Sequence, residues 1–436
     1  MKKSLLRANL LGMKGAILAV GDELTSGRIR NVTSYRAADL LSRYGYRIGE
    51  IVTVGDEKSR IVRHLRRLLE EVRFLLVSGG LGPTEDDLTT EAAAEALGLP
   101  LELNEAILSR IRENEREQGL SPNPLRDRMA YLPRGAEPLS PDLSVAGYFL
   151  SHRGRLLFFL PGVPEQFERL LVDRVIPILL DALPPGEKVF VRTLRFFDLR
   201  EAEINRAVRE IGPSGVEVGF YPVFPEVWVT LSARAKSSRE AEARVEEVAR
   251  ALRHRFPEHL FGEDDRELAR ALGDLLRERG ATLALAESCT GGLASSLVTR
   301  VPGSSEYFLG GAVTYANEVK REVLGVPERF LSLFGAVSRE VACAMAEGIR
   351  RYLKATYALS LTGIAGPTGG SPEKPVGTVW IGLSTPTETV ARRFLFPGTR
   401  HEIQLLSAYT ALDWLRRYLL TGNLFPGYRF ARDDTL

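Results

Sequence analysis

Cysteine and histidine are scarce in this chain of 436 residues, which holds two cysteines and five histidines. Cys289 and Cys343 are too few for a disulfide framework or a zinc site in a protein of this size, so we expect a reducing compartment, the cytoplasm. Of the histidines, only His401 lies in the last third of the chain, and it belongs to none of the glycine-rich motifs found there. A Ser-His-Asp triad is therefore not expected.

Long apolar runs and a charge excess are missing as well. No stretch approaches the ~18 apolar residues that a membrane-spanning helix requires. The first twelve residues lack the apolar core of a signal peptide, and Met13 is an alternative start to Met1. Lys and Arg total 58 against 56 Asp and Glu, a net charge of +2, which gives no broad basic field for nucleic acid. We expect neither a membrane nor a nucleic acid as partner.

Composition and length predict a globular protein of several domains. Hydrophobic residues make up 44% and charged residues 26%, which excludes disordered, collagen-like and coiled-coil proteins. At ~150 residues per domain, the length predicts about three domains. Turn-rich and acidic segments near Leu183 and Gly262 place these domains at residues 13–183, 188–261 and 264–421, and the remaining C-terminal residues are expected to form a loose end.

The order of the predicted elements gives a fold class for each domain. Short apolar runs alternate with amphipathic helices in the first domain, which predicts an α/β domain with a parallel sheet covered by helices. The middle domain follows the order strand, helix, two strands, long helix, typical of a small α+β domain; without a catalytic cluster, its expected role is a spacer or a dimerisation module. The third domain returns to the α/β pattern and has its own helices, so we expect it to fold alone.

A glycine-rich segment in the first domain follows the predicted strand 74–77 and precedes a helix. Backbone N–H groups at such a turn can hold a phosphate. The residues in question are Gly79, Gly80, Gly82 and Thr84. Carboxylates at the neighbouring strand end and after the loop, Glu23, Asp86 and Asp87, are oxygen ligands that a divalent cation prefers. The alternative is a tight turn followed by acidic residues that suit a helix N-terminus.

Four small-residue motifs in the third domain border apolar strands, so they could converge at one edge of a sheet. They cover residues 286–292, 302–305, 315–320 and 362–370. Without histidine, a serine nucleophile can be deprotonated by a buried lysine of lowered pKa, and Lys320 is the candidate. A solvated helix lysine is the alternative for Lys320. Cys289 is either a competing nucleophile or a small buried hydrophobe.

These motifs resemble those of the CinA family of competence/damage-inducible proteins. Residues 286–292, 315–320, 335–338 and 362–367 are similar to the family's C-terminal domain, and residues 78–89 look like its N-terminal domain. The resemblance covers nearly the whole chain. It implies an α/β protein with a MoaB/MogA-like three-layer N-terminal domain, a small KH-like α+β middle domain and a C-terminal α/β amidase domain.

The resemblance also implies an activity for the third domain. In the family, this domain is a nicotinamide-nucleotide amidase, a cofactor-free Ser/Lys hydrolase that converts nicotinamide mononucleotide (NMN) and water to nicotinate mononucleotide and ammonia. Carried over by motif, Ser288 is the nucleophile, Lys320 the base and Tyr315 a pocket residue; Ser305 matches a second family serine, and the sequence leaves open which serine attacks. Substrate and phosphate binding would fall to Thr290, Gly291, Gly292, Thr362, Gly363, Gly366, Gly369 and Arg400.

The family's N-terminal domain includes ADP-ribose pyrophosphatases that use Mg²⁺, Mn²⁺ or Co²⁺. This sequence departs from the family's amide and glycine positions at Thr33, Arg126, Met129 and residues 140–146, which predicts weak or absent pyrophosphatase activity. Two alternatives remain, namely an active pyrophosphatase beside the amidase, or a non-catalytic nucleotide-binding protein linked to competence. A homodimer is expected.

Overall fold

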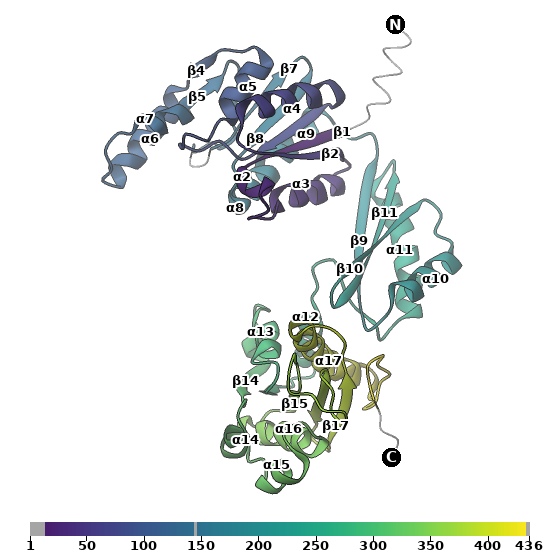
Figure 1. Ribbon diagram of the computed structural model, residues 1–436. Helices are drawn as coiled ribbons and strands as arrows, with labels where there is room; N and C mark the ends of the chain where they lie inside the picture. Colours follow the sequence, from purple (N-terminus) through teal and green to yellow (C-terminus); the bar gives the residue numbers. More distant parts are fainter. Residues whose placement is uncertain (1–13, 144–145, 433–436) are drawn as a thin grey trace. The chain divides into compact units, whose positions relative to one another are not determined.

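The computed structural model describes residues 14–143 and 146–432 (Figure 1). The chain divides into two compact units, the first made of Met1–Phe190 and Arg234–Glu242, the second of Val191–Ala233 and Ala243–Leu436. Most of the middle region therefore belongs to the same unit as the C-terminal domain. Within the described residues, no helix is both long and apolar enough to cross a membrane.

The N-terminal domain is built on a six-stranded sheet in the order β2-β1-β3-β8-β7-β6. Its strands are β1 (Lys14–Val20), β2 (Arg47–Val54), β3 (Phe74–Ser78), β6 (Glu137–Pro138), β7 (Tyr148–His152) and β8 (Arg155–Leu160). The first four strands in the spatial order run parallel, as expected, but β7 runs antiparallel to both of its neighbours, β8 and β6. A two-residue turn of positive φ, Arg153 and Gly154, joins β7 to β8, and such turns connect antiparallel strands.

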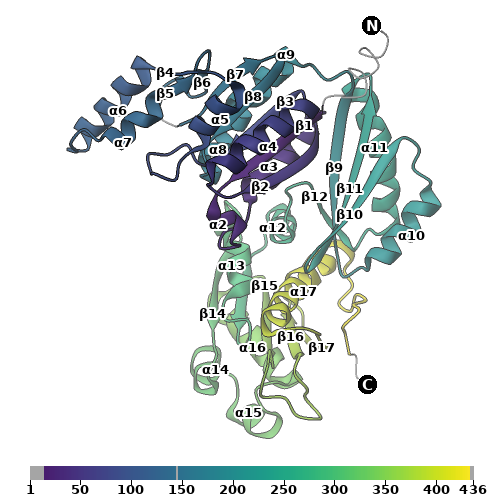
Figure 2. The ribbon, with the colours of Figure 1, turned by 45° about the horizontal axis from the view of Figure 1, so that its top comes forward.

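Helices cover both faces of this sheet, which gives the three layers expected (Figure 2). One face packs against α3 (Val32–Arg43), α8 (Pro164–Leu170) and α9 (Ile176–Ala182). The other face packs against α4 (Lys58–Glu71) and α5 (Thr89–Leu97). The remaining elements are α2 (Asp22–Thr25), α6 (Glu105–Glu117), α7 (Pro124–Asp127) and a short ribbon of β4 (Leu101–Leu103) with β5 (Tyr131–Pro133).

The middle domain has a four-stranded sheet in the order β10-β11-β9-β12. Its elements are β9 (Lys188–Phe197), α10 (Glu201–Ile211), β10 (Val216–Val223), β11 (Glu226–Ala235), α11 (Ser238–Arg255) and β12 (Leu260–Glu263). The strand β12 was not expected, because its glycine and acidic residues were assigned to a domain boundary. It pairs antiparallel with β9, and Asp264 accepts a hydrogen bond of 2.9 Å from the N–H of Thr193.

The C-terminal domain has a five-stranded sheet in the order β14-β13-β15-β16-β17. Its strands are β13 (Leu283–Glu287), β14 (Phe308–Val313), β15 (Tyr357–Gly363), β16 (Thr378–Ser384) and β17 (Thr389–Leu395). One face carries α12 (Leu268–Glu278), α13 (Leu293–Thr299) and α17 (Arg400–Thr421), the other α14 (Asn317–Leu324), α15 (Glu328–Phe334) and α16 (Arg339–Leu353). Since β13, β14 and β15 are parallel, their carboxyl ends meet at one edge.

The residues after α17 are packed, so the expected loose end is wrong for residues 422–432. The buried indole of Trp414 donates to the carbonyl of Leu424 (2.9 Å), and Tyr428 donates to the buried carboxylate of Asp413 (2.9 Å). The N–H of Leu395 donates to the carbonyl of Phe430 (3.0 Å). Buried polar groups need partners, and this segment supplies them.

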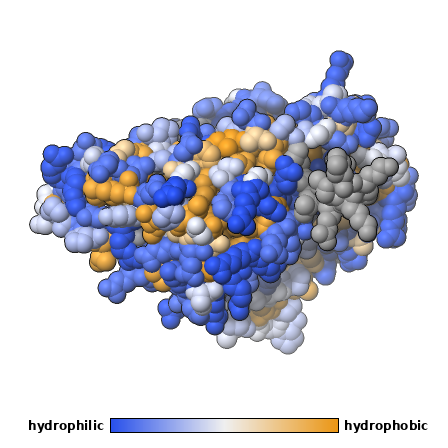
Figure 3. Space-filling model, turned by 90° about the horizontal axis from the view of Figure 1, so that it is seen from above, coloured by the Kyte–Doolittle hydropathy of each residue, from blue (hydrophilic) through white to orange (hydrophobic). Residues whose placement is uncertain are grey.

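Hydrophobic residues also reach the surface, where they form connected areas between hydrophilic ones (Figure 3). In the N-terminal domain, exposed large apolar side chains occur on the β4–β5 ribbon and around α6 and α7, at Leu103, Leu120, Leu125 and Tyr131. Such areas are typical of contact surfaces. The homodimer stays a prediction.

Candidate active site

Ser288 stands directly after β13, at the carboxyl edge of the C-terminal sheet. Its N–H donates to the carbonyl of Leu361 on β15 (2.9 Å), so the serine is fixed by the sheet itself. Gly291 and Gly292 have positive φ values of 61° and 97°, a conformation that glycine adopts without strain, and they turn the chain from the strand into α13. The result is a nearly buried serine on a tight strand-to-helix turn.

Lys320 lies in the first turn of α14 and is 1% exposed. Its Nζ is 3.1 Å from Ser288 Oγ, 2.7 Å from the carbonyl oxygen of Thr314 and 3.0 Å from that of Tyr315. Burial lowers the pKa of Lys320, because the charged form loses its hydration. The three oxygens around Nζ can accept from all three N–H groups of a charged lysine. Once Lys320 is neutral, two N–H groups still donate to the two carbonyls, and the lone pair can accept the Ser288 hydroxyl proton. The alternative of a solvated helix lysine is wrong.

Glu287, which the sequence did not single out, occupies the N-terminus of α13. This fully buried carboxylate accepts hydrogen bonds from the N–H groups of Gly292 (3.1 Å), Ala294 (3.1 Å) and Ser295 (2.8 Å), and from the Ser295 hydroxyl (2.7 Å). The N–H of Gly291 donates to the carbonyl of Ser288. The prediction that Gly291 and Gly292 hold a phosphate through this helix N-terminus therefore fails, because the protein's own groups use those donors.

Thr290 keeps a donor for a ligand. Its side chain is 4% exposed, and its Oγ1 is buried without a hydrogen-bond partner among the described residues. A buried hydroxyl without a partner has a free-energy cost that a bound ligand can remove. Thr290 is two residues from Ser288, so it stays a candidate substrate contact.

Arg400 connects two further predicted motifs, those that contain Tyr315 and Gly366, at the carboxyl edge of the C-terminal sheet. As the first residue of α17, Arg400 donates through Nη1 to the carbonyl of Gly366 (2.7 Å) and through Nη2 to the hydroxyl of Tyr315 (3.3 Å). Tyr315 is 63% exposed, and Arg400 is exposed too, so both lie at the rim. Gln404, one turn later, donates to the carbonyl of Cys289 (2.8 Å). Gln404 was not predicted from the sequence, although its spacing of four from Arg400 places it on the same helix face.

Thr362, Gly363 and Gly369 shape the site from β15 and the following loop. The Thr362 hydroxyl is buried and donates to the carbonyl of Ala336 (2.8 Å). A Cβ atom at Gly363 would lie 2.7 Å from the carbonyl oxygen of Thr378, so only glycine allows this approach of β15 to β16. Gly369 has φ 88° in the loop. Thr362 and Gly363 thus have structural partners of their own.

Ser305 lies at the opposite edge of the sheet. It belongs to a short 3-10 turn, Ser304–Glu306, just before β14 begins at Phe308, and Phe308 pairs with Leu283, the first residue of β13. Ser288 follows the last residue of β13, and five residues of strand span about 16 Å. The structure does not bring Ser305 to Lys320, so the open choice between the two serines falls on Ser288.

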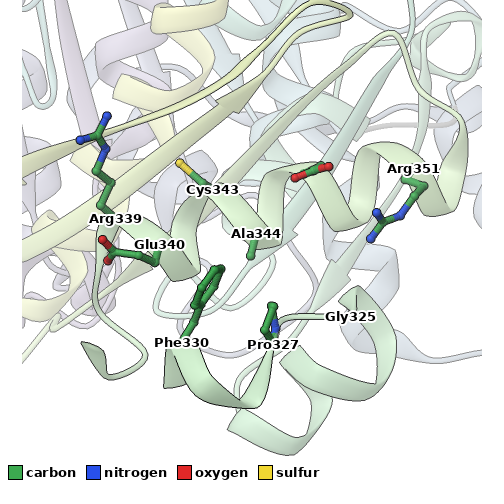
Figure 4. Close-up of a pocket in the computed structure, with 9 residues that line it drawn as sticks. Gly325, Pro327, Phe330, Arg339, Glu340, Cys343, Ala344 and Arg351 are labelled. Atoms are coloured by element: carbon green, nitrogen blue, oxygen red, sulfur yellow. The ribbon is translucent and has the colours of Figure 1, made fainter. Parts of the chain in front are cut away.

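Both cysteines are poor nucleophiles here. Burial raises the pKa of Cys289 to about 12 and that of Cys343 to about 11, so neither is a thiolate near neutral pH. Cys343 lines a cavity of about 490 Å³ between α16 and the α14–α15 segment, where Phe330 and Pro327 face α16 (Figure 4). None of the predicted site residues lines this cavity.

A second candidate site lies in the N-terminal domain. A cavity of about 470 Å³ is lined by the glycines of the loop and by all three predicted metal ligands; these residues are Gly79, Gly80, Gly82, Glu23, Asp86 and Asp87. Asp56, which the sequence analysis missed, lines it too, and its pKa is raised by burial and by repulsion from Asp22, Glu23 and Asp86. Thr84 is instead bound to Asp87, to which its N–H donates (2.9 Å).

The acids of this cavity do not form a protein-only metal cage. Among residues 14–143 and 146–432, no three His, Cys, Asp or Glu side chains lie close enough together to hold an ion. Of the departures from the family pattern, Met129 lines the cavity, whereas Arg126 pairs with Glu115 (3.4 Å) and Thr33 is buried 3.5 Å from Ser78 Oγ. Within the stretch 140–146, residues 144–145 lie outside the described part.

These observations define a class of protein: a mixed α/β chain with a molybdopterin-binding type of N-terminal domain, a KH-type middle domain and a C-terminal α/β domain with a serine–lysine pair. Three family models match in that order, the probable molybdopterin binding domain over residues 16–181, the damage-inducible protein CinA KH domain over 191–262 and the CinA C-terminal domain over 265–419. The chain belongs to the CinA family.

Individual relatives match over almost their full length. A CinA-like protein of Desulfotalea psychrophila is 45% identical over 406 residues, 93% of this chain and 98% of the relative, and one of Myxococcus xanthus is 42% identical over 421 residues, 95% and 100% of the two chains. Among solved structures, the competence/damage inducible protein CihA of Agrobacterium tumefaciens is 42% identical, with 35% of this chain and 94% of that one covered and a TM-score of 0.34.

Proposed function

We propose that the C-terminal domain hydrolyses the carboxamide of nicotinamide mononucleotide, releasing nicotinate mononucleotide and ammonia. The observation that carries the proposal is the distance of 3.1 Å between Ser288 Oγ and the Nζ of a buried lysine, Lys320. An amine of lowered pKa is a general base that needs neither histidine nor a metal. The motifs shared with the CinA family direct this Ser/Lys chemistry to a pyridine nucleotide.

In the first step, neutral Lys320 takes the Ser288 proton while Oγ attacks the carboxamide carbon. The carbon becomes tetrahedral, and its oxygen carries a negative charge that a hydrogen-bond donor stabilises. Thr290, with a buried hydroxyl that has no partner among the described residues, is the donor we assign to this oxygen. Lys320 then gives its proton to the nitrogen, the C–N bond breaks and ammonia leaves.

In the second step, water hydrolyses the ester formed on Ser288. Lys320 accepts a proton from water, hydroxide attacks the ester carbon, and the proton returns to Ser288 as nicotinate mononucleotide leaves. Arg400 and Tyr315 at the exposed rim suit the far end of the substrate: Arg400 pairs with the phosphate, and Tyr315 holds the arginine in place (3.3 Å). Glu287 and Gln404 fix the turn on which Ser288 stands.

The test is ammonia release from NMN by the purified full-length protein, with nicotinate mononucleotide identified by chromatography. Nicotinamide riboside, which lacks the phosphate, serves as the matched substrate. No ammonia from either compound, with protein shown to be folded, would refute the amidase. Ammonia from another amide but none from NMN would keep the Ser/Lys chemistry and overturn the substrate.

The acidic cavity of the N-terminal domain supports a second candidate, hydrolysis of ADP-ribose with a divalent cation. Mg²⁺ and Mn²⁺ accept one or two carboxylates and complete their coordination with phosphate oxygens and water, so the absence of a three-ligand cluster in the described part does not oppose them. One or two of Glu23, Asp56 and Asp86 would be the carboxylate ligands, since Asp87 is bound by Thr84. We propose that this activity is weak, because Met129 and Arg126 offer no amide to orient a ligand.

A further inference from the structure

Helix α17 contacts the active-site turn with one end and the middle domain with the other. In its first two turns, Arg400 binds Gly366 and Tyr315, and Gln404 binds the carbonyl of Cys289. Five residues later, the hydroxyl of Tyr409 donates to Glu226 of β11 in the middle domain (3.0 Å). At a rise of 1.5 Å per residue, Gln404 and Tyr409 are about 7.5 Å apart along a single rigid helix.

The contact with the middle domain is apolar as well as polar. Phe197 of β9 packs on the ring of Tyr409, with centroids 5.6 Å apart. Phe197 and Phe261 also belong to the buried cluster that holds Leu272 of α12 and Leu412 of α17. These two middle-domain side chains therefore belong to the hydrophobic core of the C-terminal domain, which is consistent with most of the middle domain lying in the same compact unit.

A chain of buried charges extends this contact along α17. Asp413 binds Arg416 and Arg417, each at 2.7 Å, and each of these three residues is at most 2% exposed. The C-terminal side thus holds one carboxylate for two arginines. The middle domain supplies one further partner for each arginine. The carbonyl of Glu258 accepts a hydrogen bond from Arg416, and the carboxylate of Asp198 lies 4.0 Å from Arg417.

We propose that the middle domain is a positioning element of the amidase site, acting through Tyr409, Asp198 and α17 on Arg400 and Gln404. Buried charges tolerate little displacement, because separating a buried pair leaves each charge without compensation. The network therefore fixes the rotation and height of α17, and with them the arginine at the rim and the amide that holds the Ser288 turn. The middle domain is then more than a spacer. The part of the test below that measures kcat/KM for NMN rests on the proposed function.

The experiment compares two substitutions, each of which removes one neutral hydrogen-bond donor to Glu226, in the full-length protein. Tyr409→Phe removes the hydroxyl that reaches Glu226 across the contact and keeps the ring on Phe197. Trp228→Phe removes the other neutral donor to Glu226, the indole N–H at 2.6 Å, without touching α17. Asp198→Asn is a third variant, which weakens the pairing with Arg417 and Arg429.

We expect Tyr409→Phe and Asp198→Asn to lower kcat/KM for NMN about tenfold, less than the ~100-fold that a 1 Å misplacement in an active site can cost. Hydrogen exchange in residues 288–292 and 399–405 should become faster in both, and Trp228→Phe should match the wild type in kinetics and exchange. Folded Tyr409→Phe with wild-type kinetics and exchange would overturn the proposal, as would an equal effect of Trp228→Phe. Exchange is measured without substrate, so it still decides the positioning role if NMN is not hydrolysed.

Discussion

Both candidate sites of this protein lie at the carboxyl edge of a parallel sheet, beside a glycine-rich turn. They differ in how their charged groups are paired. In the C-terminal domain, the glycine turn is closed by Glu287, and the reactive pair Ser288–Lys320 is buried and in contact. In the N-terminal domain, four carboxylates line one cavity, none of the described residues that line it is basic, and Asp56 is repelled by its acidic neighbours. The first site pairs its charged groups within the protein, whereas the second leaves its acids facing one cavity.

The largest effect should follow from removing the serine–lysine pair. We expect Ser288→Ala and Lys320→Met each to reduce ammonia release from NMN by about four orders of magnitude or more, because loss of an activated nucleophile or its base has that size of effect. Ser305→Ala is the matched control, since this serine lies at the far edge of the sheet, and it should keep wild-type turnover. A dead Ser305→Ala together with an active Ser288→Ala would reverse the assignment.

The next largest effect should follow from substituting Arg400, at the exposed rim of the candidate active site. Arg400→Ala should raise KM for NMN about tenfold to a hundredfold, which corresponds to the ~1.5 to 3 kcal/mol of a hydrogen bond to a charged group. KM for nicotinamide riboside should change little, because that compound has no phosphate to pair with the guanidinium. Equal losses for both compounds would show that Arg400 acts on the loop at Gly366 rather than on the phosphate.

The pH dependence should distinguish a buried lysine from an ordinary one. Lys320 must be neutral to accept a proton, so kcat/KM for NMN should rise with pH through its lowered pKa and then level off. The unfolded chain binds this proton up to a higher pH, so the free energy of unfolding should also rise between the two pKa values. Both are measured as pH profiles, with Lys320→Met as control for unfolding. A rate that rises only near pH ~10.4, the pKa of a solvated lysine, would contradict the role.

The smallest effects should be those that a change at the acidic cavity has on the amidase activity of the C-terminal domain. EDTA and Asp86→Ala should leave ammonia release unchanged, because the serine–lysine chemistry needs no cation. AMP formation from ADP-ribose should be slow or absent even with Mg²⁺, Mn²⁺ or Co²⁺. Turnover on the order of 1 per second or more, abolished by Asp86→Ala, would show that the acidic cavity is an active site and that Met129 and Arg126 are tolerated.

Much of the architecture was predictable from the sequence, because it depends on local features: the spacing of apolar residues, and the glycine and proline residues that end an element. Apolar runs of four to eight residues gave the parallel strands, and glycine and proline marked their ends. Other strands lack such signals: β14 has two adjacent glycines, β12 has four residues of which one is glycine, and β7 is joined to β8 by a turn of only two residues. The packed C-terminal residues were missed because their partners, Asp413 and Trp414, lie on a preceding helix.

The sequence by itself determined the family, the fold class and the residue types of the active site, since four motifs in a fixed order carry that information. Only the tertiary structure decided which of these residues meet. It separated Ser305 from Lys320 by the length of a strand, used the helix N-terminus for Glu287, and added Gln404, Asp56 and the contact of Tyr409 with the middle domain. These are contacts between residues distant in sequence, and strand order and burial, rather than local pattern, bring such residues together.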